Sequence, residues 1–149
     1  MTGGVPHPIT LILADDHPLF LAAVRDFLAQ EPGIRVLAIA ADGPEAWCAI
    51  RQHQPDVAIL DLAMPGLTGL AVAHAVQENG LNTTIVLLTM HQEEHVVRSA
   101  LAHGIRHYVL KEDLDSHLIP AIQAALAKRA YFSPKLLTAA LRATIAKLP

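Results

Sequence analysis

Apolar and polar residues along the chain form two alternating patterns, one typical of buried strands and one typical of helices. Short apolar runs that are rich in β-branched residues, and mostly lack polar alternation, predict strands buried on both faces. These runs cover residues 9–14, 34–40, 57–60, 84–89 and 106–110. The segments that follow each run carry apolar residues at helical spacing. They predict helices over residues 18–30, 43–53, 67–80, 93–104 and 114–128.

This alternation predicts an α/β fold. Strands and helices in strict succession favour one open parallel sheet with helices on both faces, because right-handed crossovers place helices on alternate faces once the strand order reverses. Sheets of this kind bind ligands outside the carboxyl ends of the strands, at the point of reversal. Functional residues are therefore expected where the strands end.

The amino-acid composition excludes several classes of protein. The chain has 149 residues, of which 52% are hydrophobic and 17% charged, enough for one compact domain with a filled core. Cys48 is the only cysteine, which excludes an internal disulfide and a thiolate zinc cluster. The sequence shows neither a secretion signal nor an apolar run of the roughly 20 residues that cross a bilayer. We therefore expect a soluble, cytoplasmic protein with no membrane partner.

Charge is distributed unevenly along the chain. Residues 1–128 carry a formal net charge of −7, whereas residues 129–149 carry +4. An acidic body is a poor surface for nucleic acid. The basic end is either a solvated helix face or a contact with a phosphate backbone or another protein.

Polar side chains follow four of the five predicted strands. Asp15 and Asp16 come directly after the first strand, Asp61 follows the third, Thr89 ends the fourth and Lys111 follows the fifth. One aspartate at such a position is usually a turn former or a helix cap. Three clustered carboxylates, however, repel one another unless a cation neutralises them. Mg²⁺ suits this role, because it prefers oxygen ligands and is commonly held by one or two carboxylates and a phosphoryl oxygen.

Asp61 has two roles open to it at such a site. A carboxylate beside a metal is a ligand, and it can also act as a nucleophile that accepts a phosphoryl group to give an aspartyl phosphate. Lys111 would offset the added negative charge, and Thr89 would donate a hydrogen bond to a phosphoryl oxygen.

Four short motifs carry a resemblance to a known family. "ADDHP", "LDLAMPGLTGL", "LLTMH" and "HYVLK", in this order and at these separations, resemble the receiver domain of two-component response regulators over residues 9–127. The details are most similar to the NarL/FixJ subfamily, which joins a receiver to a LuxR-type helix-turn-helix output. They are the Asp-Asp-His-Pro and Leu-Thr-Met-His runs, the acidic residue in place of proline after Lys111, and "YFSP" after the last receiver helix. This resemblance implies a flavodoxin-like, doubly wound, five-stranded parallel sheet of order 2-1-3-4-5, with an extra C-terminal linker helix.

The resemblance also implies a role for each site residue. Asp61 matches the phosphoacceptor, which takes its phosphoryl group from the phosphohistidine of a sensor histidine kinase. Asp16 matches the direct Mg²⁺ ligand, Asp15 the neighbour that acts largely through water, and Ala63 the position that supplies a backbone carbonyl ligand. Mn²⁺ is the alternative ion. Such a chain is a phosphotransfer acceptor that modifies itself and not a conventional enzyme.

Three further positions match the family's switch. Thr89 matches the switch hydroxyl, Lys111 the lysine that pairs with the phosphoryl group, and Tyr108 the aromatic that changes rotamer when the hydroxyl moves. Residues 104–108 read Gly-Ile-Arg-His-Tyr, where the family commonly has Gly-Ala-x-Gly-Tyr. The larger side chains are expected to restrict this loop and hence the Tyr108 rotamer.

The expected organisation has three parts: an N-terminal extension (1–8), the receiver domain (9–128), and a linker segment (129–149) whose helix is expected over 133–148. The linker would lead to a DNA-binding output domain that lies outside this chain and controls transcription. The chain is then either an excised receiver or a stand-alone one. A homodimer is the expected assembly, and DNA contact is expected only through the output domain.

Other functions compete with this reading. A receiver-like dimerisation module that ignores phosphate is the second hypothesis. Haloacid-dehalogenase-like phosphatases need a second aspartate where Ala63 stands. The run "HQEEH" (91–95) formally fits a zinc-protease pattern, but His91 is expected just after a strand and not on a helix with His95. No glycine-rich nucleotide fingerprint occurs in the sequence.

Overall fold

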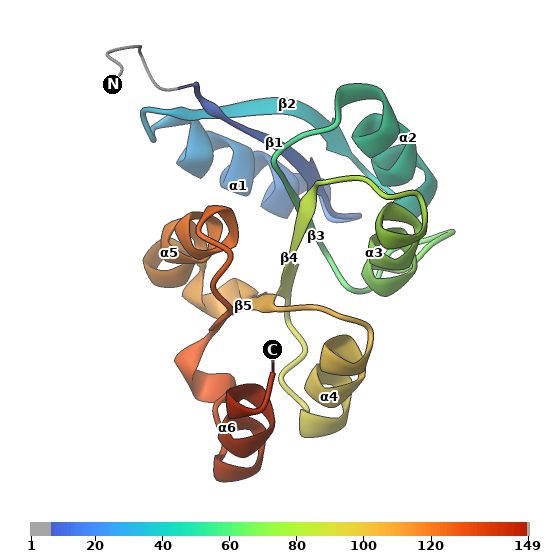
Figure 1. Cartoon of the computed structure of the whole chain (residues 1–149). Helices are drawn as coiled ribbons and strands as arrows, with labels where there is room; N and C mark the ends of the chain where they lie inside the picture. Colours follow the sequence, from blue (N-terminus) through green and yellow to red (C-terminus); the bar gives the residue numbers. More distant parts are fainter. Residues whose placement is uncertain (1–6, 149) are drawn as a thin grey trace.

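The computed structural model describes residues 7–148, and its centre is one parallel sheet (Figure 1). The sheet has six strands in the order β2-β1-β3-β4-β5-β6, and each pair of neighbours is parallel. The strands are β1 (Ile9–Ala14), β2 (Ile34–Ala40), β3 (Val57–Leu60), β4 (Thr84–Thr89), β5 (His107–Leu110) and β6 (Tyr131–Phe132). The order reverses between β1 and β3, so the carboxyl ends of these two strands flank the expected ligand position.

Helices cover both faces of the sheet. They are α1 (Pro18–Ala29), α2 (Gly43–His53), α3 (Gly69–Glu78), α4 (Glu94–Ala102), α5 (Leu114–Leu126) and α6 (Ala139–Ala146). Apolar residues of α1 and α5 pack on one face, in a core with Leu11, Val86 and Val109. Apolar residues of α2, α3, α4 and α6 pack in the core of the other face. Strands buried on both sides explain why the apolar runs lack polar alternation.

The predicted elements are largely confirmed. The first four strands have the expected bounds, and β5 begins at His107, one residue later than expected. Helices α1, α3, α4 and α5 end one or two residues before the predicted limits, at turns that the apolar pattern does not resolve.

Two expectations about the sheet edge and the C-terminus are corrected. The sheet has six strands and not five, because Tyr131 and Phe132 pair with the outer edge of β5. The C-terminal helix covers residues 139–146 and not 133–148, because a 3₁₀ turn at Pro134–Leu136 precedes it. Lys128 adopts a left-handed conformation with φ of 58°, which ends α5 and turns the chain back towards the sheet.

The predicted N-terminal extension (1–8) lies largely outside the described residues. Within residues 7–148, no helix is long and apolar enough to cross a membrane.

Candidate functional site

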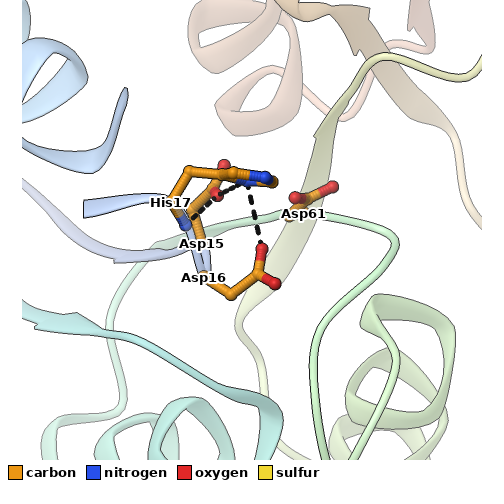
Figure 2. A group of neighbouring side chains, drawn as sticks. All are labelled: Asp15, Asp16, His17 and Asp61. Carbon is orange, nitrogen blue, oxygen red and sulfur yellow. Dashed lines mark hydrogen bonds and ion pairs between the residues drawn. The ribbon is translucent and has the colours of Figure 1, made fainter. Parts of the chain in front are cut away.

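Two buried carboxylates lie side by side where the strand order reverses. Asp15 follows β1 and Asp61 follows β3, and the Asp61 amide donates a hydrogen bond of 2.9 Å to the carbonyl of Ala14. Both side chains are only 5% exposed, whereas the Asp16 side chain is 33% exposed. One ligand atom from each of these aspartates and from His17 can be chosen such that all four lie within 4.8 Å of one another. Figure 2 shows how the four side chains converge.

The loop after Asp61 is held close to the aspartate. The amide of Ala63 donates to Asp61 Oδ1 over 3.4 Å, and the amide of Gly69 donates to the carbonyl of Leu62 over 2.8 Å. A Cβ atom on Gly69 would lie 2.5 Å from the Asp61 carbonyl oxygen, so only glycine permits this approach at the start of α3. The loop therefore returns over the site and keeps Ala63, the predicted carbonyl ligand, beside the phosphoacceptor candidate.

Lys111 bridges the two buried carboxylates. Its Nζ lies 2.7 Å from Asp15 Oδ2 and 3.0 Å from Asp61 Oδ2, and its side chain is 9% exposed. The ammonium also lies 4.4 Å from the centroid of the Phe20 ring, which gives it a cation–π contact. The sequence predicts that Lys111 offsets the charge of an added phosphoryl group; here its ammonium bridges the two most buried of the three acids.

Burial and the contacts within the cluster shift the pKa values of Asp61 and Lys111. Loss of solvent raises the pKa of Asp61, although the hydrogen bond and the charge of Lys111 act in the opposite direction. Burial alone would lower the pKa of Lys111, but its hydrogen bonds and charge interactions with Asp15 and Asp61 outweigh burial and raise it. Lys111 is therefore a firmly charged ammonium, and Asp61 is more basic than an ordinary aspartate.

His17 is the site residue that the sequence reasoning missed. Its Nδ1 lies 2.9 Å from Asp15 Oδ1 and 3.1 Å from Asp16 Oδ1, and its backbone amide donates to Asp15 Oδ1 over 2.8 Å. The His17 side chain is 64% exposed, so it is the most solvent-accessible member of the cluster. Its position between the aspartate pair and Pro18, the first residue of α1, was the available signal, because a helix start fixes the preceding residue near the strand end.

The predicted switch residues meet at the backbone of His91. Thr89 is buried, and its Oγ1 accepts a hydrogen bond of 3.2 Å from the His91 amide. The Tyr108 ring is fully buried, and its hydroxyl donates to the His91 carbonyl over 2.6 Å. Burial raises the pKa of the Tyr108 hydroxyl, so it stays protonated and remains a donor. The larger side chains at Ile105 and His107 therefore coexist with an inward Tyr108 ring.

The donor set fits a hard divalent cation. Three carboxylates lie together, with the Ala63 backbone beside Asp61 through its amide, and carboxylate oxygens of this kind suit Mg²⁺. The zinc-protease pattern does not fit, because α4 begins at Glu94 and His91 lies before it, so His91 and His95 do not share a helix face.

Comparison with known proteins identifies relatives over most of the chain. The family model of the response regulator receiver domain matches residues 11–123. The oxygen regulatory protein NreC of Staphylococcus carnosus is 36% identical over 129 residues, which are 86% of this chain and 59% of that protein. This chain thus spans well under two thirds of the length of that curated relative.

Solved structures agree with these matches. The signal receiver domain of the putative response regulator NarL from Mycobacterium tuberculosis has a TM-score of 0.80 at 35% identity, covering 83% of this chain and all of that one. A two-component response regulator of the LuxR family from Aurantimonas sp. SI85-9A1 has a TM-score of 0.82 at 31% identity, with 94% of this chain and 96% of that one covered.

Proposed function

This chain belongs to the response regulator receiver domain family, in its LuxR-type branch, and from that premise we propose that Asp61 accepts a phosphoryl group in a Mg²⁺-dependent reaction. Receiver domains of two-component systems act with sensor kinases, so the proposed donor is the phosphohistidine of a sensor histidine kinase. The main support for the proposal is one observation. Lys111 contacts two buried carboxylates, Asp15 and Asp61, and a third carboxylate, that of Asp16, lies beside them.

We assign a role to each residue of the site. An Asp61 carboxylate oxygen forms the new bond to phosphorus, the N–P bond of the donor breaks, and the donor imidazole keeps the electron pair and takes a proton. Asp15, Asp16, Asp61 and the Ala63 carbonyl would hold Mg²⁺, or Mn²⁺ in its place. A bound Mg²⁺ ion neutralises developing charge on the phosphoryl oxygens.

Lys111 is proposed to compensate negative charge during this reaction. Its ammonium contacts Asp61 Oδ2 in the present structure, and the same group can follow the negative charge onto the phosphoryl oxygens. Before this exchange, the contacts with Asp15 and Asp61 raise the pKa of Lys111 and keep it charged. Thr89, at the carboxyl end of the strand next to β3, is the proposed hydroxyl donor to a phosphoryl oxygen.

A conformational change is the proposed product. A phosphoryl group adds about −1.5 to −2 charges and three acceptor oxygens. Moving a two-state equilibrium from 1:99 to 99:1 takes about 5.5 kcal/mol, which a few charge-assisted hydrogen bonds can supply. If the Thr89 hydroxyl turns towards Asp61, the His91 amide loses its acceptor and the Tyr108–His91 contact is perturbed.

The remaining proposals concern the longer protein and its partners. Residues 9–128 are proposed to act as the receiver and residues 129–149 as the connection to a DNA-binding output domain. A homodimer is the proposed assembly of the activated state, and DNA contact is assigned to the output domain only.

The test is intact mass after incubation with Mg²⁺ and acetyl phosphate. We expect one added phosphoryl group, with acetate as the leaving group, and complete loss of this adduct in Asp61→Asn and after chelation. Asp26→Asn is the matched control, because Asp26 is an exposed acid paired with Arg25 on α1. An adduct that persists in Asp61→Asn would remove Asp61 from the acceptor role. A protein that binds Mg²⁺ but forms no adduct would support the phosphate-independent dimerisation module.

A further inference from the structure

A cavity of about 430 Å³, named here the amino-end cavity, lies where β4 and β5 begin. Its lining residues come from the two strand starts and from two helices, and they include Thr84, Arg106, His107, Ala125 and Ile145. Sites for small molecules commonly have volumes of roughly 300–1,000 Å³. The amino-end cavity is therefore large enough for a small ligand, and it lies at the opposite end of the sheet from the phosphoacceptor candidate.

Three cationic side chains line the amino-end cavity, those of Arg106, Lys128 and Arg129. None of the described residues around the cavity is an aspartate or a glutamate. The arginines and lysines that form ion pairs within residues 7–148 are others, namely Arg25, Arg98, Lys111 and Lys135. The three cations of the cavity thus have no carboxylate partner in that part of the chain. Positive charge gathered around one cavity attracts anions.

The Arg106 guanidinium is held in place through one of its three nitrogens. Its Nη1 donates to the carbonyl of Leu101 over 3.2 Å and to the carbonyl of Ile105 over 3.0 Å. No acceptor among residues 7–148 binds Nε or Nη2 of this side chain. These two nitrogens carry the parallel N–H groups that a carboxylate or a phosphate accepts as a pair. Arg106 is therefore a fixed cation that retains the fork for an anionic group.

Lys128 has a backbone conformation that is usual for glycine. It follows Ala127, the C-terminal cap of α5, and its φ of 58° is left-handed. Glycine is common at this position because it has no Cβ atom. Other residues in this conformation carry a cost, and they cluster at sites that bind ligands. Lys128 thus brings a positive charge to the cavity at a position where the fold alone favours glycine.

The remaining wall of the amino-end cavity is largely apolar. It includes Ala125, Ala130, Ile145 and Leu148. Ile145 and Leu148 are half-buried and pack against the core of the face that α2, α3 and α4 cover. An inorganic anion would leave this wall in contact with water, whereas a ligand with an apolar body would bury it. Cations and an apolar wall together fit an organic anion better than a simple ion.

We propose that the amino-end cavity is a binding site for a small organic anion. Its anionic group, a carboxylate or a phosphate, binds Arg106, Lys128 and Arg129, and its apolar body lies against Ile145 and Leu148. The site is separate from Asp61, so the proposal does not depend on phosphoryl transfer.

The first test is an NMR titration of the ¹⁵N-labelled chain in the presence of a chelator. Benzoate and phenylphosphonate supply an anionic group on an apolar ring, inorganic phosphate supplies the charge alone, and benzyl alcohol the ring alone. We expect saturable shifts at the amides of Arg106, Lys128 and Arg129 with the first two probes. Inorganic phosphate and benzyl alcohol should bind at least about tenfold more weakly, because each lacks one half of the interaction. The tighter of the two organic anions identifies the anionic group.

Three outcomes of this titration would overturn the proposal. Inorganic phosphate that binds as tightly as benzoate would indicate an adventitious ion only. Shifts that do not saturate, or that occur equally at cations elsewhere on the surface, would mean that no site is present. Shifts at Gln77 and His103, with none at Lys128, would place the probe in the cavity of about 310 Å³ that these two residues line between α3 and α4.

Variants of Arg106 test the role of the fork. Arg106→Gln should weaken benzoate binding at least about tenfold, the effect expected for loss of a charged hydrogen-bonding partner. Arg106→Lys should fall between this variant and the parent, because lysine keeps the charge and loses the paired N–H groups. Arg51→Gln is the matched control, since Arg51 lies over the Trp47 ring on α2, and it should leave binding unchanged. Unchanged benzoate affinity in Arg106→Gln would contradict the proposal.

Lys128→Gly separates binding from folding. Glycine suits the left-handed conformation, so the unfolding temperature should not fall, whereas benzoate binding should weaken about threefold through loss of a partly exposed charge. Circular dichroism measures the first quantity and the NMR titration the second. This variant also decides the matter if Arg106→Gln does not fold. A Lys128→Gly protein that binds benzoate as tightly as the parent would overturn the assignment of this cavity.

Discussion

The two ends of the parallel sheet satisfy their buried polar groups in different ways. At the carboxyl ends, Asp15 and Asp61 are balanced by the side chain of Lys111. At the amino ends, the side chains of Thr83 and His107 bind main-chain carbonyls, those of Pro55 over 2.7 Å and Arg129 over 2.8 Å. Thr89 at the carboxyl end also binds a main-chain group, the His91 amide, but the two carboxylates there share a side-chain partner, which can move away without a change in the backbone.

The difference in partners distinguishes an end of the sheet whose buried groups can react from an end whose buried groups only stabilise the fold. A side-chain ammonium between two carboxylates can be displaced by a cation or can follow a new negative charge, so the site remains adjustable. A histidine that donates to a carbonyl fixes the turn between α5 and β6, and its loss leaves that carbonyl without its donor. Variants at Lys111, His107 and Asp61 test whether the contrast between an adjustable and a fixed end holds.

The largest effect is expected at the carboxyl end, from Lys111→Met. Removing one partner of a buried charge group leaves the other charges uncompensated, and we expect the free energy of unfolding at pH 7 to fall by about 3 kcal/mol. The double variant Lys111→Met/Asp61→Asn should recover much of this loss, because it removes one of the two uncompensated carboxylates. Urea denaturation measures both changes. A Lys111→Met protein as stable as the parent would mean that solvent, and not Lys111, compensates the carboxylates.

A smaller effect is expected at the amino end, from His107→Ala. This change removes the donor to the Arg129 carbonyl and leaves a small cavity, and we expect a loss of about 2 kcal/mol in the free energy of unfolding. Phosphoryl uptake by Asp61 should stay the same, since His107 lies at the other end of β5. His53→Ala, at an exposed position in α2, is the control for loss of a histidine. A clear fall in phosphoryl uptake with unchanged stability would show that the amino end also takes part in the chemistry.

The fold was predictable from the sequence because its signals are local. Buried parallel strands are short apolar runs, and each of the first five was visible in this way. The sixth strand was not, because two residues are too few to show a period and the pairing of Tyr131 and Phe132 depends on the open edge of β5. The same limit applies to α6, whose start is set by the Thr138 cap and by the turn at Pro134–Leu136.

The site was predictable to the extent that topology brings strand ends together. Asp15, Asp61 and Lys111 meet as expected, because their strands β1, β3 and β5 lie in one sheet with parallel directions. The contact of His17 with both aspartates depends on side-chain rotamers and on the entry of α1, which no spacing rule specifies. The larger side chains at residues 105 and 107 are expected to restrict the Tyr108 rotamer, which stays a prediction; the structure adds that His107 binds the Arg129 carbonyl and that Tyr108 is buried.

The smallest expected effect is in the pH dependence of stability, and it differs in sign between the two ends. Burial lowers the pKa of His107, so between that value and the usual 6.5 the unfolded chain binds more protons, and stability falls as the pH falls. Burial raises the pKa of Asp61, so between 3.8 and the raised value the folded chain binds more protons, and stability rises as the pH falls. Each group contributes at most about 1.4 kcal/mol per pH unit.

Two variants resolve these opposite slopes by urea denaturation between pH 7 and pH 4. His107→Gln should weaken the loss of stability that begins below pH 6.5, because the unfolded variant no longer takes up the extra proton. Asp61→Asn should remove the gain at lower pH and should be more stable than the parent at pH 7, where the parent carries a buried ionised carboxylate. Slopes that change in the same direction in both variants would show that the two ends do not differ in how burial acts on their ionisable groups. Opposite changes would mean that the buried charge at the carboxyl end lowers the stability of the folded chain. This is the property expected of a site that binds a cation and a phosphoryl group.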